Sequence, residues 1–223
     1  MGKRTKFVLI IFAIIFSLSS LFFYFFYKKA TKNKFEEMRR NMTSVAVSAA
    51  MAVDEQKHSK ILTAKDMTSP EYLQTKEILK KFKDNHPYIR YIYTMRKTNK
   101  PNIWKFVVDA SEPKDDNGDG VISELEKVTP VGEEYDVSKY PEMQKAFEGP
   151  IADKTIDRDK WGWWLSAYAP IYNSKNEPTA IVGVDVSAKT IEEEYLKLRK
   201  RIIVMFGLSI ILSLIIEIAW GKS

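Results

Sequence analysis

The chain has 223 residues, a formal net charge of +6 and no cysteine. Its length leaves room for one globular domain of about 170 residues between two hydrophobic ends. The lack of cysteine excludes disulfides, thiolate metal sites and cysteine catalysis. Lysine and arginine are densest beside the hydrophobic ends, which is typical of headgroup anchors and does not indicate a nucleic-acid partner. His58 and His86 lie in polar sequence typical of surface residues.

The first predicted element is a membrane-spanning helix over residues 7–27, after a short tail at 1–6. No small-residue cleavage site follows this segment, which favours an uncleaved anchor over a signal peptide. A second apolar stretch at 202–220 follows the basic sequence KLRKR and leaves a tail at 221–223. We therefore expect a two-pass protein of the cell (inner) membrane, with a domain at 28–201 between the spans.

The orientation of that domain is not fixed by charge, because basic residues flank it on both sides. Taken alone, the positive-inside rule would place the domain in the cytoplasm, but long domains translocate largely regardless of charge. A calcium loop of the extracellular kind, described below, is useful where calcium is abundant. We therefore expect the domain to be extracytoplasmic.

A long helix is predicted to continue directly from the first span. Its apolar residues recur at alternating spacings of three and four, which puts them on one face. Such a stripe needs a partner, which is either the domain's own sheet or a second copy of the chain; we favour a homodimer. The stripe consists of Phe35, Met38, Met42, Val45, Ala49 and Ala52.

The remaining elements predict an α+β fold built on an antiparallel sheet. A second helix is expected at 69–86, with Ser69 as N-cap and Pro70 at its first position. Segments rich in β-branched and aromatic residues then predict strands at 88–97, 103–110, 162–172 and 179–188. A short helix is expected at 140–149, a hairpin turn at 173–178, and a last helix at 189–201 that runs into the second span.

The segment DDNGDGVISELE, residues 115–126, has the spacing of an EF-hand-type calcium loop. Calcium takes six to eight oxygen ligands, and short acidic and amide side chains on alternate residues of a tight turn can supply them. Gly120 would provide the sharp bend. The flanking sequence does not predict paired EF-hand helices, and an ordinary ion-free turn remains the alternative. The predicted ligands are Asp115, Asn117, Asp119, Val121 through its carbonyl, Ser123 and Glu126.

The order of these elements, together with the sequences YIRYIYTMRK, WKFVVDA, SAYAPI and GVDVSA, resembles a single Cache domain. Cache domains are PAS-like extracellular sensors of bacterial chemoreceptors, histidine kinases and cyclic-dinucleotide synthases. The resemblance covers residues 30–200 and implies a long N-terminal helix, a PAS-like sheet and a small-molecule ligand held against that sheet. Carried over position by position, it makes Tyr135, Trp161, Trp163, Tyr168 and Asp185 the candidate ligand-binding residues.

Aromatic walls with one carboxylate suit an amine or an amino-acid-like ligand. The alternative is structural: the aromatic residues would form the core, and Asp185 would pair with Arg90 or Arg96. The sequence shows no nucleophile and base pair, so we expect no enzyme. Only three residues follow the second predicted span, so signalling would need a further module or a separate cytoplasmic partner. The alternative function is a calcium-stabilised accessory protein that binds another protein.

Overall fold

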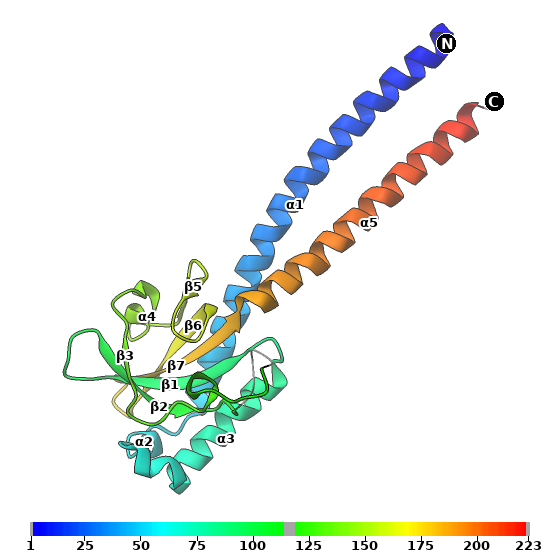
Figure 1. Ribbon diagram of the computed structural model, residues 1–223. Coiled ribbons are helices and arrows are strands. Elements are labelled where there is room, and N and C mark those ends of the chain that lie inside the picture. The colour runs from blue at the N-terminus through cyan, green and yellow to red at the C-terminus, as the bar shows by residue number, and fades with distance from the viewer. Residues whose placement is uncertain (1, 114–118, 222–223) are drawn as a thin grey trace. The chain divides into compact units, whose positions relative to one another are not determined.

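The computed structural model describes residues 2–113 and 119–221. The chain forms two compact units, one of residues 37–190 and one that combines residues 1–36 with 191–223. Two long helices, α1 (Lys3–Ala52) and α5 (Ala188–Gly221), contribute residues to both units. The sheet and the shorter elements belong to the first unit, and the terminal halves of the two helices form the second (Figure 1).

Within the described part of the chain, the sheet is antiparallel and has seven strands in the order β3-β2-β1-β7-β6-β4, with β5 paired to β6. Four strands match the predicted ones: β1 (Tyr91–Lys97), β2 (Ile103–Asp109), β6 (Trp163–Tyr172) and β7 (Pro178–Ser187). The short strands β3 (Glu134–Asp136), β4 (Ile151–Ala152) and β5 (Asp157–Arg158) were not predicted from the sequence. The predicted α+β class and antiparallel sheet are therefore confirmed.

Helices and 3₁₀ turns occupy both sides of this sheet. They are α2 (Glu55–His58), η1 (Ala64–Thr68), α3 (Pro70–Asn85), η2 (Glu124–Glu126) and α4 (Pro141–Lys145). The start of α3 is as predicted, because the Ser69 side chain accepts a hydrogen bond from the Tyr72 backbone nitrogen at 3.2 Å and Pro70 follows. Helix α4 packs over one face of the sheet, and α3 runs along the other (Figure 1).

The apolar stripe of α1 is buried within a single chain. Met38, Met42, Val45 and Ala49 are all at most 6% exposed, and none of them needs a second subunit to be covered. The expectation that these residues form a dimer seam is therefore wrong, since the fold of one chain already removes them from water. Ala52 at the end of the stripe is exposed. A homodimer stays a prediction that would have to use another surface.

His58 is buried rather than exposed, which corrects the sequence-based expectation. Its Nε2 lies 2.8 Å from the Thr94 hydroxyl, and Arg96 donates to the His58 backbone oxygen at 2.8 Å. Burial, and then the charge of Arg96, lower the pKa of His58 to about 3. This histidine is therefore a neutral structural residue on the α3 face of the sheet.

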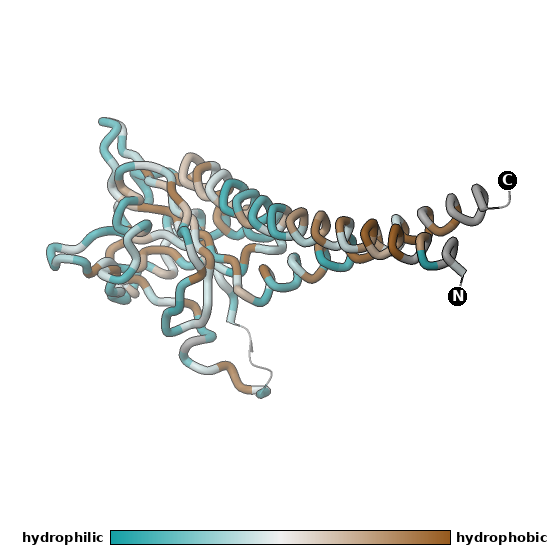
Figure 2. Tube along the Cα trace, turned by 90° about the horizontal axis from the view of Figure 1, so that it is seen from above, coloured by the Kyte–Doolittle hydropathy of each residue, from teal (hydrophilic) through white to brown (hydrophobic). Residues whose placement is uncertain are grey.

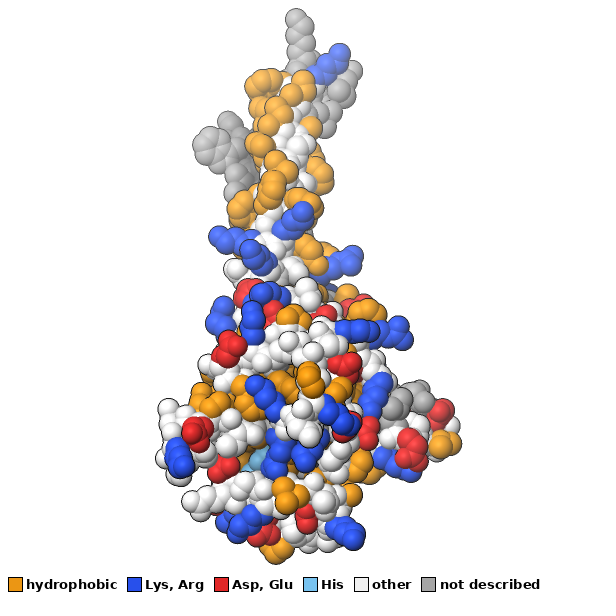
Figure 3. All heavy atoms as spheres, turned by 90° about the vertical axis from the view of Figure 1, so that its left-hand side faces the viewer, with side chains coloured by type: hydrophobic (Ala, Val, Ile, Leu, Met, Phe, Trp, Pro, Cys, Tyr) orange, Lys and Arg blue, Asp and Glu red, His pale blue; other side chains and the backbone are white. Residues whose placement is uncertain are grey.

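The unit formed by the chain ends consists of two apolar helical segments (Figure 2). Phe23 of α1 and Phe206 of α5 pack edge to face at 4.6 Å, and Lys34 pairs with Glu194 at 3.4 Å. Large hydrophobic side chains are exposed along both helices, for example Phe22 at 62% and Leu208 at 60%. Lysine and arginine side chains gather at one end of the hydrophobic surface (Figure 3). This pattern fits a lipid environment.

Among the described residues, one helix, α1, is long and apolar enough to cross a membrane. The predicted second span lies within α5, which is helical up to Gly221. Whether α5 also crosses the membrane stays a prediction.

Candidate ligand-binding site

A cavity lies on the α4 face of the sheet, and its walls are aromatic and acidic. Its volume is about 50 Å³, and one water molecule needs about 10–15 Å³ by this measure. The space therefore suits a molecule of a few non-hydrogen atoms. Strands β1, β2, β3 and β6 and the loop before β6 supply the aromatic walls, which include Tyr91, Phe106, Tyr135, Trp161, Trp164 and Tyr168.

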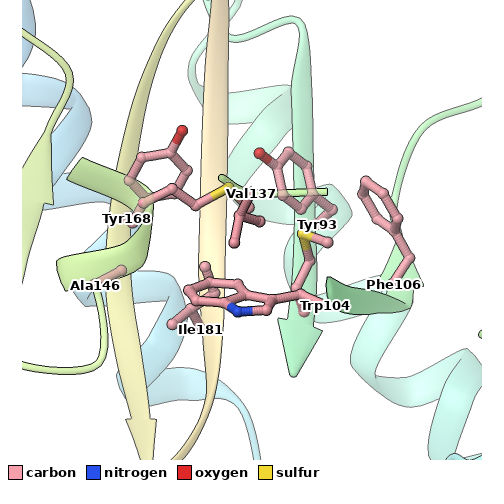
Figure 4. Packing of buried hydrophobic residues seen from close by; sticks show 9 residues of the cluster. Tyr93, Trp104, Phe106, Val137, Ala146, Tyr168 and Ile181 are labelled. Atoms are coloured by element: carbon pink, nitrogen blue, oxygen red, sulfur yellow. The ribbon is translucent and has the colours of Figure 1, made fainter. Parts of the chain in front are cut away.

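The aromatic side chains hold one another in place. The ring of Tyr135 stacks on Trp161 at 5.8 Å and on Tyr140 at 5.6 Å, and Trp161 meets Phe106 at 5.7 Å nearly at a right angle. In Figure 4 the hydroxyl groups of Tyr93 and Tyr168 point away from Trp104, toward the same side of the cluster. The walls are thus rigid, and they present both ring faces and hydroxyl groups.

Asp159 organises the loop that carries Trp161. One of its oxygens, Oδ1, accepts hydrogen bonds from the backbone nitrogens of Trp161 and Gly162 at 2.8 and 3.0 Å, and from the Trp164 indole at 2.9 Å. Its other oxygen accepts from the Tyr135 hydroxyl at 3.3 Å. Because four donors surround this carboxylate, its role is to position the aromatic wall.

Asp185 projects from β7 into the cavity and is 7% exposed. In the strand register it lies opposite Ser166 of β6 on one side and Tyr91 of β1 on the other. The Tyr93 hydroxyl donates to Asp185 Oδ1 at 3.3 Å. Burial raises the pKa of Asp185 well above its usual range; a hydrogen bond with the Ser166 side chain opposes this shift, and the nearby carboxylates of Asp159 and Asp153 add to it.

Asp153 follows β4 and is 3% exposed. Its backbone nitrogen donates to the backbone oxygen of Ser166 at 2.8 Å, and its side-chain oxygen Oδ2 accepts from the backbone nitrogen of Ser166 at 3.0 Å. Burial, opposed by that hydrogen bond and assisted by the charges of Asp157 and Glu142, raises the pKa of Asp153 to about 7. Within residues 2–113 and 119–221, neither Asp153 nor Asp185 has a cationic side chain as ion-pair partner.

The structure brings together four of the five predicted ligand-binding residues: Tyr135, Trp161, Tyr168 and Asp185 all line the cavity. Trp163 does not line it. Alternate residues of a strand face opposite sides of the sheet, so Trp164, Ser166 and Tyr168 point to the cavity, whereas the Trp163 side chain is 53% exposed beneath the guanidinium of Arg158. Arg96, the suggested partner of Asp185, lies on the other face against His58.

Sequence reasoning missed Asp153, Asp159, Trp164 and Tyr93. Trp164 and Tyr93 could have been found from the alternation of a strand, in which every second residue lies on the same face. Trp164 shares a face of β6 with the predicted residue Tyr168, and Tyr93 shares a face of β1 with the aromatic residue Tyr91. Asp153 and Asp159 lie in polar loop sequence, where nothing distinguishes a buried aspartate from a solvated one.

Only part of the predicted calcium loop can be placed. Asp115 and Asn117 lie outside the described residues. Asp119 accepts a hydrogen bond from the Val121 nitrogen, and Glu126 accepts one from the Ser123 nitrogen, both at 2.8 Å. Gly120 has a φ of 84°, the left-handed conformation that favours glycine at the bend of such a loop. The residues described here contain no group of three acidic or histidine side chains arranged for a metal.

Comparison with known proteins gives the fold. No protein-family model matches the chain, and no curated protein sequence matches it. The ligand-binding domain of the Campylobacter jejuni chemoreceptor Tlp3, solved with L-norvaline, is similar over 80% of this chain, with a TM-score of 0.50 and 14% identity. Two further structures have lower TM-scores: the Tlp3 sensory domain with isoleucine (TM-score 0.48, 13% identity, 87% of this chain) and the Tlp1 sensory domain from the same organism (TM-score 0.44, 9% identity, 73% of this chain).

The chain spans 63%, 67% and 59% of the lengths of these three domains. At this level of identity the likeness shows the fold alone. The chain therefore has the fold of a chemoreceptor sensory domain, and the resemblance to the PAS-like Cache domain is confirmed at that level.

Proposed function

We propose that this protein is a membrane-anchored sensor whose extracytoplasmic domain binds a small molecule with an ammonium group. The observation that carries the proposal is a pair of buried carboxylates, Asp153 and Asp185, in an aromatic cavity and without a cationic partner among the described residues. A buried carboxylate without a counter-ion is costly. A ligand ammonium group supplies that counter-ion.

The walls of the cavity favour the same chemistry. An ammonium group gains from the faces of aromatic rings, and here it would also form charge-assisted hydrogen bonds with Asp185. The Tyr93 hydroxyl, which contacts Asp185 Oδ1, holds that carboxylate in place. A domain of the same fold, that of Tlp3, was solved with L-norvaline, a ligand that carries an ammonium group.

Signal transmission in this proposal uses the two long helices. β7 leads directly from Asp185 into α5, and α1 contacts the cavity's Asp153 through Arg39. If both helices cross the membrane, a ligand that favours one of two packings of the helices shifts their equilibrium. Output would then require a cytoplasmic partner or module.

The test uses the full-length chain in detergent micelles, titrated calorimetrically with butylamine and with butanol as the uncharged control. We expect butylamine to bind and butanol not to bind. The variant Asp185→Asn should weaken butylamine at least about tenfold, because a charge-assisted hydrogen bond contributes about 1.5–3 kcal/mol. Asp136→Asn, a change in the exposed part of β3, is the control and should have no effect. Equal affinity in the Asp185 variant, or no binding of the amine, would contradict the proposal.

We also propose that calcium binds the loop at 115–126 and stiffens it. Gly120 has the backbone conformation that the loop requires, and Glu126 lines the ligand cavity, so bound calcium would fix one wall. Calorimetry on the full-length chain should give a dissociation constant of about 0.1–1 mM, and Asp119→Ala should abolish the signal. The matched variant Asp136→Ala should leave it intact. Equal calcium binding by both variants would refute a site in this loop.

A further inference from the structure

Three residues form a row across the cavity face of the sheet. Asp153 is joined to Ser166 by hydrogen bonds in both directions, and Ser166 lies opposite Asp185 in the register of β6 and β7. Neighbouring strands are about 5 Å apart, so the backbones of the two aspartates are separated by about 10 Å, with Ser166 between them. The side chains of all three residues line the cavity.

The charges around the cavity are unbalanced. Among the described residues, its lining contains six acidic residues and two basic ones. Two of the acids are occupied by backbone or ring donors: Asp159, as described above, and Asp109, which accepts from the backbone nitrogens of Ser111 and Thr129 at 2.8 Å each. Asp153 and Asp185 are also deeply buried; the Ser166 backbone nitrogen donates to the carboxylate of Asp153, and the Tyr93 hydroxyl donates to that of Asp185.

The two basic residues at the cavity have contacts elsewhere. The Arg158 guanidinium lies over the exposed ring of Trp163 at 5.7 Å, on the outer side of β6. Lys127 pairs with Glu124 at 2.5 Å, and more than half of its side chain is accessible to solvent. Beside Asp153, a ligand carboxylate would lie next to an acid that has no described cationic partner.

Resting on the proposed function for this cavity, we propose that its ligand is a small diammonium compound and that Asp153 is the specificity-determining residue. One ammonium group binds Asp185, the second binds Asp153, and the Ser166 hydroxyl lies between them. The rings of Tyr91, Tyr168 and Trp164 flank the alkyl chain that joins the two groups. A zwitterionic amino acid is disfavoured, because its carboxylate would lie beside Asp153.

The experiment compares three ligands of the same chain length on the full-length protein: putrescine with two ammonium groups, butylamine with one, and γ-aminobutyrate with one ammonium and one carboxylate. We expect putrescine to bind at least about tenfold more tightly than butylamine, as a second charge-assisted contact allows. γ-Aminobutyrate should bind more weakly than butylamine. The same order should appear in thermal-shift measurements.

Asp153→Asn should remove the preference for putrescine and bring its affinity to that of butylamine. Asparagine keeps an oxygen for the Ser166 nitrogen, so the fold is preserved. The control is Glu142→Gln, which removes a nearby charge that pairs with Lys154 at 3.2 Å outside the cavity lining; its preference for putrescine should persist.

Each result has one meaning. If butylamine and putrescine bind equally to the unmodified chain, the second carboxylate site is refuted while the amine sensor stands. If γ-aminobutyrate binds most tightly, the ligand is a zwitterion and the present inference is wrong. If none of the three binds, the proposed function itself fails. If the Asp153 variant keeps the putrescine preference, the residue assignment is wrong.

Discussion

Gly183 determines where the ring of Tyr93 lies, and Tyr93 in turn contacts Asp185. A β-carbon at position 183 would lie 2.5 Å from the Tyr93 ring, closer than any real contact of that kind. The ring crosses β7 at this glycine, which lets the Tyr93 hydroxyl reach Asp185 Oδ1. The missing side chain is therefore part of the site.

Gly183→Ala should displace Tyr93 and destabilise the protein by about 1–3 kcal/mol, the usual cost of overpacking a core. It should also weaken butylamine binding, because Asp185 loses its hydroxyl donor. Thermal unfolding and calorimetry measure the two effects. Gly149→Ala is the matched control, since a β-carbon there has no neighbour within 4 Å. An unchanged affinity in the Gly183 variant would show that Tyr93 does not position Asp185.

Asp153 makes the stability of the ligand-free protein depend on pH. Its pKa is about 7 in the folded chain against 3.8 as the ordinary value. Between these values the native state holds a proton that the unfolded state has lost, so stability falls as pH rises through this window. The slope for one such group is about 1.4 kcal/mol per pH unit. Above a pH of about 7 this loss of stability is complete. The pKa of Asp185 is also raised in the folded chain, so Asp185 likewise makes stability fall as pH rises.

Asp153→Asn should therefore flatten this fall and raise the melting temperature at pH 8 more than at pH 5. Thermal unfolding of the ligand-free chain in micelles at both pH values is the measurement. Glu148→Gln, at an exposed position, serves as control for the loss of one acidic charge. A variant with the pH dependence of the unmodified chain would mean that Asp153 is ionised in the fold throughout.

At the scale of elements, α1 is tied to the edge of the sheet by one side chain. Arg39 donates from Nε to the backbone oxygen of Asp153 at 2.7 Å and from a terminal guanidinium nitrogen to the backbone oxygen of Ala152 at 3.0 Å. Asp153 is thus held through its main chain by the helix that contains the candidate span, while its side chain lines the cavity. A change at the cavity has a direct route to α1 through this residue.

Arg39→Ala should lower the free energy of unfolding by about 1.5–3 kcal/mol, since hydrogen bonds to a charged group are lost and two carbonyls lose a donor. Arg40→Ala, at an exposed position one residue on, should change it by less than about 0.5 kcal/mol. Denaturant titration of both variants tests this. Equal stabilities would show that the contact is weak and unsuited to transmission.

The sequence allowed the long elements to be predicted and left the short ones out. Strands β6 and β7 are ten residues each and rich in residues that favour sheets, so their pattern alone was sufficient. β4 and β5 have two residues each and exist because they pair with β6, which no local pattern reveals. The parity of β6 was predictable in principle, but the candidate list took Trp163 instead of Trp164. Asp153 is held through its backbone oxygen by Arg39, more than a hundred residues earlier in the chain, and no local pattern reveals this contact.

At the scale of the whole molecule, the proposal depends on a two-pass topology with the domain outside. The exposed apolar side chains of α1 and α5 fit a lipid environment, and a span at each end would place both termini in the cytoplasm. A single span at α1 would instead leave the C-terminus on the same side as the domain. A measurement of membrane topology therefore distinguishes a sensor that signals across the membrane from a domain held by one anchor.

The chain contains no cysteine, so single introduced cysteines report topology without background. We expect Lys175→Cys, in the exposed turn between β6 and β7, to react with a membrane-impermeant maleimide in intact cells. Lys6→Cys and Ser223→Cys should react only after permeabilisation, because both ends would lie inside. Labelling of Ser223→Cys in intact cells would show that α5 does not cross the membrane. Labelling of Lys6→Cys together with protection of Lys175→Cys would show that the domain lies in the cytoplasm. In either case the amine site could still be present, but it could no longer signal across the membrane in the way proposed here.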